Sequence, residues 1–201
     1  MPALPPVSKK LVIVGDGACG KTSLLIVFKG GQFPTNHLPT VFESSVVDVT
    51  VGNDRVVELN LWDSAGQEEY RSLRTLCYPD TDVVLICYSI DNPDSYDNVK
   101  SLWYPDISHF CRGVPYVLVA CKSDIRNNPA AIEEMRRAGA QRDQPITKEE
   151  GQRLANEIGA KAFIECSALA NFNVQRVFET AARLALAKGG DSTPSGCCVI
   201  L

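Results

Sequence analysis

Hydrophobic residues in this chain form short continuous blocks and alternating blocks, separated by longer amphipathic stretches. Continuous apolar blocks are typical of strands that are covered on both faces of a sheet, whereas strict alternation on both sides of a turn predicts a hairpin. The hairpin turn here is Gly52-Asn53-Asp54. On this basis we expect strands at residues 11–14, 45–50, 55–62, 82–88, 115–121 and 162–166.

Between the expected strands, the apolar residues take the spacing of amphipathic helices. The first helix follows residue 22 and ends before the glycine pair Gly30-Gly31, and Thr147 is placed to cap a later one. Strands that alternate with helices predict an α/β fold, with a doubly wound, mostly parallel sheet whose one antiparallel strand comes from the hairpin. Further helices are expected at residues 93–111, 131–140 and 173–188.

The composition fits a single soluble domain with a sizeable core. Hydrophobic residues make up 45% of the 201 residues, and a net charge of −4 leaves no basic surplus for binding nucleic acid. The eight cysteines show no C-x-x-C spacing and follow no secretory signal, so we expect reduced thiols and a cytosolic compartment. The longest apolar runs are too short to span a bilayer.

One stretch carries a specific chemical pattern, Gly15-Asp16-Gly17-Ala18-Cys19-Gly20-Lys21-Thr22, which fits G-x-x-x-x-G-K-[ST]. An expected strand precedes it and an expected helix follows it, which is the context that this phosphate-binding pattern requires. Backbone N–H groups of residues 17–22, the positive end of the helix and the charge of Lys21 together predict a triphosphate site. The hydroxyl of Thr22 is suited to a phosphate-bound Mg²⁺.

A second group of polar residues, Asp63-Ser64-Ala65-Gly66-Gln67, follows the hairpin. An aspartate there can hold Mg²⁺, commonly through water, and Gly66 lets a backbone N–H approach a γ-phosphate. Gln67 can orient an attacking water. D-x-x-G is a weak pattern alone, but one strand after a phosphate loop it predicts the hydrolytic side of a nucleotide site.

Two further segments at expected strand ends predict that the base is guanine. Asp124, in Cys121-Lys122-Ser123-Asp124, can accept two hydrogen bonds from the N1–H and N2–H₂ edge of guanine, a donor pair that adenine lacks. Lys122 can lay its alkyl stem along the base. Glu165-Cys166-Ser167-Ala168 supplies backbone N–H groups suited to guanine O6. Either segment alone fits an ordinary turn, but in this order after a phosphate loop they favour guanine.

Together these motifs resemble those of the Rho-family small GTPases, and the similarity extends over residues 8–201. It includes residues 63–70 and 78–82, and the charged helix at 131–140 matches the insert that separates Rho proteins from other small GTPases. The resemblance implies the small G-protein fold of phosphate-loop NTPases, with a mostly parallel six-stranded sheet flanked by helices. It also implies a GTPase domain over residues 1–188 and a flexible tail over residues 189–201.

The resemblance assigns roles in hydrolysis and metal binding by position. Lys21 and Gln67 are the expected catalytic residues. The expected Mg²⁺ ligands are Thr22, Thr40 and, through water, Asp63, with Thr40 ligating only when GTP is bound. Two switch segments are implied, at about residues 34–44 and 65–78.

Contacts with the base and with partners follow from the same resemblance. Phe33 is expected to pack against the base, and Val41-Phe42-Glu43 is expected to meet effectors. The full nucleotide-binding set is Gly17, Ala18, Cys19, Gly20, Lys21, Thr22, Ser23, Phe33, Thr40, Gly66, Cys121, Lys122, Asp124, Ser167, Ala168 and Leu169.

The family implies a guanine-nucleotide switch that binds GTP or GDP with Mg²⁺, hydrolyses GTP slowly and controls the actin cytoskeleton. Implied partners are exchange factors, GTPase-activating proteins that insert an arginine, a dissociation inhibitor and cytoskeletal effectors, but no nucleic acid. The implied location is the cytoplasmic face of the plasma membrane or of an internal membrane, with exchange into the cytosol. Two other classes fit less well: a nucleotide-independent scaffold, and a phosphate-loop kinase, which needs an arginine-bearing lid that we do not find.

The sequence departs from the family pattern at three places. Cys121 stands where relatives usually have Asn or Thr, His37 where they usually have Tyr, and Ser44-Ser45 where they usually have Asn-Tyr. A thiol is a weak hydrogen-bonding group, so one hypothesis is that Cys121 speeds the loss of GDP; the alternative is that water or a neighbouring group compensates.

The last four residues, from Cys198 to Leu201, fit the C-a-a-X prenylation pattern, and a terminal leucine favours geranylgeranyl. Stable anchoring usually takes a second signal, and no run of lysines or arginines precedes this cysteine. We therefore expect Cys198 to be geranylgeranylated and Cys197 to accept a palmitoyl group.

Overall fold

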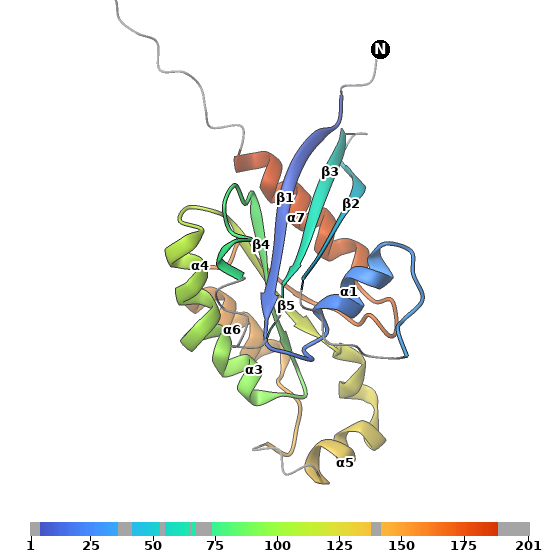
Figure 1. Cartoon of the computed structure of the whole chain (residues 1–201). Helices are drawn as coiled ribbons and strands as arrows, with labels where there is room; N and C mark the ends of the chain where they lie inside the picture. Colours follow the sequence, from blue (N-terminus) through green and yellow to red (C-terminus); the bar gives the residue numbers. More distant parts are fainter. Residues whose placement is uncertain are drawn as a thin grey trace, which may run out of the picture.

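The structure, a computed structural model, describes residues 5–35, 42–52, 55–64, 66, 74–137 and 142–188 (Figure 1). Its centre is a six-stranded sheet in the order β2-β3-β1-β4-β5-β6. β2 runs antiparallel to β3, and the other neighbours are parallel, which confirms the expected α/β fold. The strands are β1 (Val7–Gly15), β2 (Phe42–Val51), β3 (Arg55–Ser64), β4 (Val83–Ser89), β5 (Tyr116–Cys121) and β6 (Ala162–Glu165).

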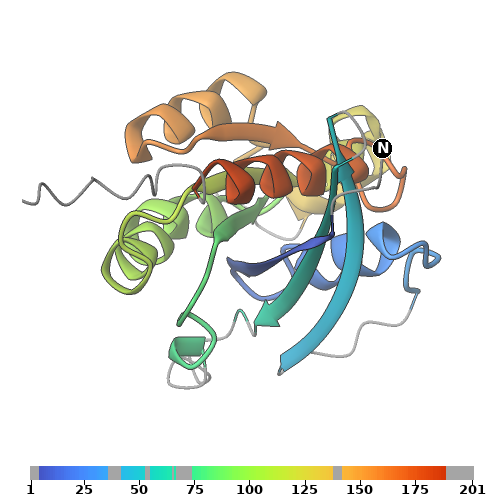
Figure 2. The same cartoon turned by 90° about the horizontal axis from the view of Figure 1, so that it is seen from above.

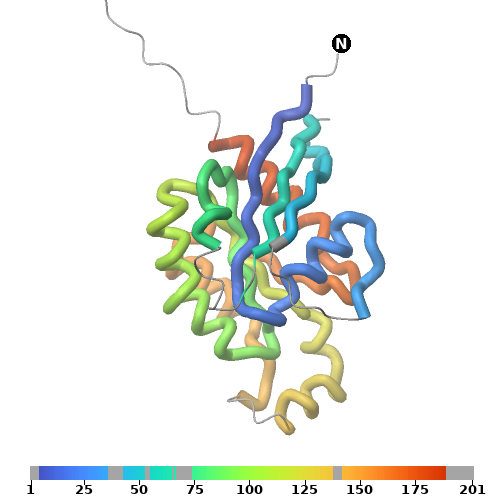
Figure 3. Tube along the Cα trace, viewed as in Figure 1, coloured from blue at the N-terminus to red at the C-terminus, as the bar shows by residue number. Residues whose placement is uncertain are grey.

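β1 lies between β3 and β4 and is covered on both faces (Figure 3). Leu11 and Ile13 belong to one hydrophobic cluster, while Val12 and Val14 belong to the other. All four side chains are fully buried. The continuous apolar run follows from this position, because successive side chains of a strand point to opposite faces and here both faces need an apolar residue.

Helices cover each face of the sheet. On one face, α1 (Lys21–Phe28) packs with α7 (Val174–Lys188), and the rings of Phe28 and Phe178 stack with centroids 3.7 Å apart. Figure 2 shows α7 extended along the sheet. The other face is covered by α3 (Pro93–Asn98), the turn η2 (Val99–Trp103), α4 (Tyr104–Phe110) and α6 (Lys148–Ile158). None of the helices within the described residues is long and apolar enough to cross a membrane.

The helix expected at 93–111 proves to be three consecutive pieces, α3, η2 and α4. Asn92 caps its start by accepting a hydrogen bond from the backbone of Ser95, and Pro93 occupies the first turn. The middle piece, η2, is a π-helical turn, whose i→i+5 hydrogen bonds span one residue more than those of an α-helix. Apolar spacing does not reveal such a turn, because it shifts the register by a single position.

Three other helix boundaries can be compared with the expectation. Thr147 caps α6 in a full capping box with Glu150, as predicted. α5 is Pro129–Arg137 and begins two residues earlier than expected, while residues 138–140 lie outside the described residues. α7 begins at Val174 rather than at Asn173, because Asn173 has a φ of 56°, which ends any helical path.

Candidate functional site

The loop between β1 and α1 has the shape of an anion cradle. Ala18 and Gly20 have left-handed backbones, with φ of 59° and 105°. A Cβ on Gly15 would lie 2.1 Å from the carbonyl oxygen of Cys87, so only glycine fits there. No side chain caps α1 at Gly20, and no acidic residue stands in its first turn. The N–H groups at its N-terminus therefore lack an acceptor within the helix, and an anion bound in the loop would accept their hydrogen bonds.

Lys21 provides the positive charge of this loop. Its side chain is buried, and Nζ donates to the carbonyl oxygens of Gly15 and Asp16, both at 2.7 Å. The ammonium group is thus held inside the curve of the loop, where it can exchange these oxygens for those of a phosphate. Gly17 and Ala18, at the top of the loop, are exposed.

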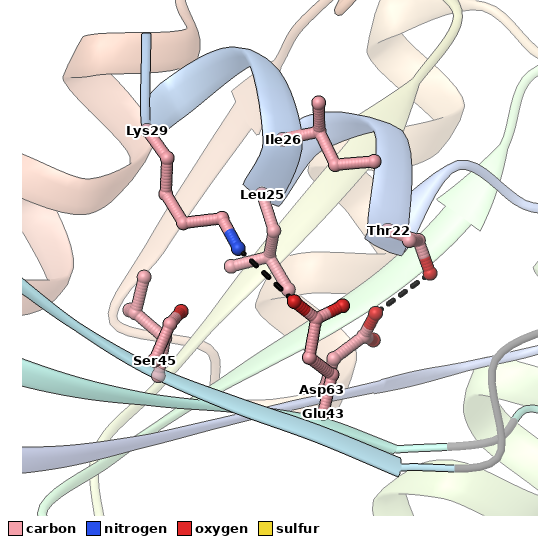
Figure 4. Close-up of a pocket in the computed structure, with 8 residues that line it drawn as sticks. Thr22, Leu25, Ile26, Lys29, Glu43, Ser45 and Asp63 are labelled. Atoms are coloured by element: carbon pink, nitrogen blue, oxygen red, sulfur yellow. Dashed lines mark hydrogen bonds and ion pairs between the residues drawn. The ribbon is translucent and has the colours of Figure 1, made fainter. Parts of the chain in front are cut away.

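Thr22 and Asp63 meet between α1 and the end of β3 (Figure 4). The Thr22 hydroxyl donates to Oδ2 of Asp63 at 2.6 Å, while Oδ1 of Asp63 is buried and has no hydrogen-bond partner among the described residues. Burial raises the pKa of Asp63, and the Thr22 hydroxyl and Lys21 oppose this shift. A buried carboxylate with one open oxygen beside a threonine hydroxyl fits a divalent cation such as Mg²⁺.

A small cavity of about 10 Å³, roughly the room for one water, borders these two residues. Leu25 and Ile26 of α1 and Ser45 of β2 also line it (Figure 4). Lys29 and Glu43 pair at 3.3 Å at its edge. Ser45 is one of the positions that departs from the family pattern, and its short side chain leaves this space beside α1.

Gly66 brings the chain after β3 against the phosphate loop. A Cβ at this position would lie 2.3 Å from the backbone N of Gly17 and 2.5 Å from the carbonyl oxygen of Gly15. Glycine is therefore the residue that allows this contact. Gln67, Thr40 and Val41 lie outside the described residues, and of Phe42 only the backbone, at the start of β2, is described.

The two segments expected to recognise guanine are adjacent. Ser123 donates its backbone N–H to the carbonyl of Cys166 at 3.0 Å, and the Ser167 hydroxyl donates to Oδ1 of Asp124. Asn173 donates from Nδ2 to the carbonyl of Glu165 at 2.8 Å and so fixes the loop before α7. The structure thus brings together Asp124 and Ser167, 43 residues apart in the sequence.

The other described residues expected to contact the nucleotide differ in how exposed they are and in what they bind. Lys122 has a left-handed backbone with a φ of 60°, and its Nζ pairs with Asp91 at 3.2 Å, an anchor that the sequence did not indicate. Phe33 is half-buried, and Leu169 is exposed on the β6–α7 loop. Ser23 is buried within α1.

Cys121 is buried at the end of β5, directly beneath the phosphate loop. A Cβ on Gly20 would lie 3.4 Å from its Cβ. Cys19, Cys87 and Cys166 belong to the same hydrophobic cluster, and all are reduced. Burial raises the pKa of Cys19 to about 11 and raises the pKa of Cys87, so these thiols are protonated at neutral pH and pack as small apolar groups.

Sequence reasoning gave no role to the side chain of Asp16. Its carboxylate accepts hydrogen bonds from Nε1 of Trp103 at 2.6 Å and from Nδ2 of Asn98 at 2.8 Å. These donors are 87 and 82 residues away in the sequence, so no local pattern could have indicated them.

The phosphate loop, Asp63, Asp124 and Ser167 all lie at or just after the carboxyl ends of the parallel strands β1, β3, β5 and β6. Ligands of open α/β sheets bind at this edge. The arrangement can hold phosphates at one end, a divalent cation beside them, and a base with two adjacent donors at the other end.

Comparison with known proteins agrees with this geometry. The family model described as the Ras family matches residues 10–187. GTP-binding protein RHO1 of Saccharomyces cerevisiae is 57% identical over 180 residues, which cover 90% of this chain and 84% of that protein. GTP-binding protein rho5 of Schizosaccharomyces pombe is 56% identical, with 90% and 88% covered, and GTP-binding protein RHO1 of Candida albicans is 53% identical, with 96% of each chain covered.

Proposed function

Since the chain belongs to the Ras family, we propose that this site holds a guanine nucleotide and that the protein is a Rho-type switch that hydrolyses GTP. One observation carries the proposal: the buried Lys21 of the phosphate loop, the Thr22–Asp63 pair and the Asp124–Ser167 pair lie along one edge of the sheet. A phosphate site alone suits any nucleotide. The carboxylate of Asp124 adds the preference for guanine, since adenine would leave it unpaired.

Binding of the phosphates follows from the loop geometry. The N-terminus of α1 has no side-chain cap and no acidic residue in its first turn, so its backbone N–H groups are available to the phosphates. Lys21 gives up its bonds to the carbonyl oxygens of Gly15 and Asp16 and takes phosphate oxygens in their place. The exposed top of the loop, Gly17 and Ala18, leaves room for the ligand.

Ras-family GTPases generally need Mg²⁺ with the nucleotide. The open Oδ1 of Asp63 and the neighbouring hydroxyl of Thr22 support the proposal that these residues, with Thr40 in the GTP state, hold that ion here. When bound, Mg²⁺ neutralises charge on the phosphate oxygens. The protein's part is to hold the carboxyl group of Asp63 buried at the end of β3, beside the hydroxyl of Thr22.

For hydrolysis, we propose that Gln67 orients the attacking water and that Lys21 stabilises the charge that develops on the phosphates. The Gly66 contact brings the chain just before Gln67 against the phosphate loop. An arginine supplied by a GTPase-activating protein adds about 10³–10⁵ in rate in such sites. Slow hydrolysis by the protein alone is therefore part of the proposal.

Regulators and effectors are partners that the family implies. More specifically, we propose exchange factors, GTPase-activating proteins, a dissociation inhibitor and cytoskeletal effectors, with residues 41–43 in the effector contact and the actin cytoskeleton as the output. We propose α5 as the Rho-type insert, because it projects from the end of the sheet that carries the site (Figure 1). Cys198 and Cys197 are the proposed lipid anchors on the cytoplasmic face of a membrane.

Nucleotide competition and phosphate release test the proposed function. Full-length protein loaded with fluorescent GDP should lose it to excess GTP or GDP but not to ATP, and GTP-loaded protein should release phosphate slowly. Displacement by ATP as readily as by GTP would overturn the guanine assignment. Retention of intact GTP in the presence of a Rho-type GTPase-activating protein would instead favour a binding scaffold.

A further inference from the structure

Trp103 occupies an unusual position next to the phosphate loop. It is fully buried at the end of the π-helical turn η2, and its Nε1 donates to Oδ1 of Asp16 at 2.6 Å. Asn98, at the end of α3, donates to the other oxygen of the same carboxylate at 2.8 Å. Hydrogen bonds to a charged acceptor are about twice as strong as those between neutral groups. The second residue of the phosphate loop is therefore held by the helical layer behind it.

This anchor acts on the backbone that binds phosphate. The carbonyl oxygen of Asp16 accepts from Nζ of Lys21, and the next residue, Gly17, begins the run of backbone N–H groups proposed to bind phosphate. Holding the side chain of Asp16 restricts the path of the loop between Gly15 and Gly17. Oriented N–H groups bind an anion well only if they do not have to reorganise.

Trp103 also contacts Arg74 at the start of the described segment 74–137. The guanidinium of Arg74, itself buried, lies 4.6 Å from the centre of the indole ring. Gly66 packs on the backbone of Asp16 and Gly17, where a Cβ would lie 2.4 Å from the carbonyl carbon of Asp16. Gly66 thus packs against Asp16 and Arg74 packs against Trp103, the two residues joined by the indole hydrogen bond.

We propose that Trp103 is a positioning residue for the nucleotide site: its indole N–H holds Asp16 and with it the turn of the phosphate loop, while its ring supports Arg74. This inference rests on the proposed function. The π-helical turn supports the proposal, since such turns occur often at functional sites. The alternative is that Trp103 only fills the core, in which case its replacement lowers stability and leaves nucleotide exchange unchanged.

Dissociation of fluorescent GDP from the full-length protein separates the two roles. Trp103→Phe keeps an aromatic ring but lacks the donor, and Asp16→Ala, on a partly exposed loop, removes the acceptor without replacing any core side chain. Each should release GDP about tenfold faster than wild type, as expected for the loss of a charge-assisted hydrogen bond. The double variant should be no faster than the faster single variant, because both changes break one contact. Asp16→Asn, which keeps an oxygen that can accept from Trp103, should restore much of the slow release.

Ile107→Val is the matched control, because Ile107 is buried in the same cluster and its apolar side chain has no donor for the carboxylate of Asp16. It should lower the melting temperature and leave the release rate within about twofold of wild type. Release rates of Trp103→Phe and Asp16→Ala that match wild type, or effects that multiply in the double variant, would overturn the positioning role. Failure of the wild-type protein to bind GDP would overturn the proposed function as well, whereas normal binding with unaffected variants would overturn this inference alone.

Discussion

The Ser167 hydroxyl donates a hydrogen bond to Oδ1 of Asp124, and so joins the chain that follows β6 to the chain that follows β5. The same hydroxyl accepts the backbone N–H of Ala170 at 3.0 Å. The carboxylate is therefore held in place before any base arrives. A fixed acceptor loses little entropy on binding and distinguishes strictly between a donor and an acceptor on the ligand.

Asp124→Asn should weaken GDP binding and favour a xanthine nucleotide. The new amide places a donor against a donor of guanine, whereas xanthine has a carbonyl in place of the exocyclic amine. Loss of a hydrogen bond to a charged group corresponds to about 1.5–3 kcal/mol, or roughly 10- to 200-fold in affinity. Competition of GDP and XDP for the fluorescent nucleotide measures the change.

Ser167→Ala serves as the control for Asp124→Asn, because it keeps the carboxylate and removes only its support. It should weaken GDP binding by a smaller factor and leave the preference over XDP intact. An unchanged ratio of GDP to XDP affinity in Asp124→Asn would show that another group reads the base.

Cys121→Asn should slow the release of GDP. The amide can hydrogen-bond both the base and the phosphate loop above it, where Gly20 lies close, and each new bond is worth about 0.5–1.5 kcal/mol, or roughly 2- to 13-fold. Cys121→Ala, which removes the thiol and adds no polar group, should resemble wild type. Equal release rates for all three proteins would mean that the thiol of Cys121 does not weaken the binding of GDP.

Removal of Mg²⁺ should act through Asp63. We expect EDTA to speed GDP release from the wild-type protein by tenfold or more. The chelator removes the cation that would link the phosphates to Asp63 and Thr22. Asp63→Asn should release GDP quickly with or without EDTA. Stopped-flow measurement with Mg²⁺ and with chelator gives both rates, and a strong EDTA response in Asp63→Asn would place the cation elsewhere.

The C-terminal cysteines lie outside the described residues, and their prediction stands on the sequence. Cys198→Ser should make the protein fully soluble on cell fractionation, because it removes the prenyl site. Cys197→Ser should shift a large part of it to the cytosol, since one lipid chain alone binds membranes weakly and reversibly. Wild-type binding should survive a high-salt wash, because little of it is ionic. Cys197→Ser that stays as membrane-bound as wild type would contradict a second lipid at Cys197.

Local patterns were sufficient for the sheet and for the parts of the site that follow strand ends. The phosphate loop depends on glycines and a lysine at fixed spacing, and the buried strands depend on runs such as residues 11–14, so each could be read within a short window. The N-cap at Thr147 is also local, because the residue that completes its capping box is three positions away.

The rest depended on contacts between distant residues. The hydrogen bond between Asp16 and Trp103 joins two segments that are distant in the sequence, and Trp103 ends a π-helical turn that apolar spacing does not encode. The ion pair between Lys122 and Asp91 likewise links the ends of two neighbouring strands. Such contacts form only when helices and strands that are distant in the sequence pack together, so no short stretch of sequence indicates them.

Single-turnover phosphate release from the GTP-loaded, full-length protein, with and without a Rho-type GTPase-activating protein, tests the central claim most directly. Wild type should be slow alone and about 10³–10⁵ times faster with the activator, while Gln67→Leu should stay slow in both conditions and bind GDP as wild type does. Gly17→Val should behave similarly, because its side chain would crowd the space in which the activator's arginine and Gln67 meet. A Gln67→Leu protein that hydrolyses GTP with the activator as fast as wild type would contradict the account.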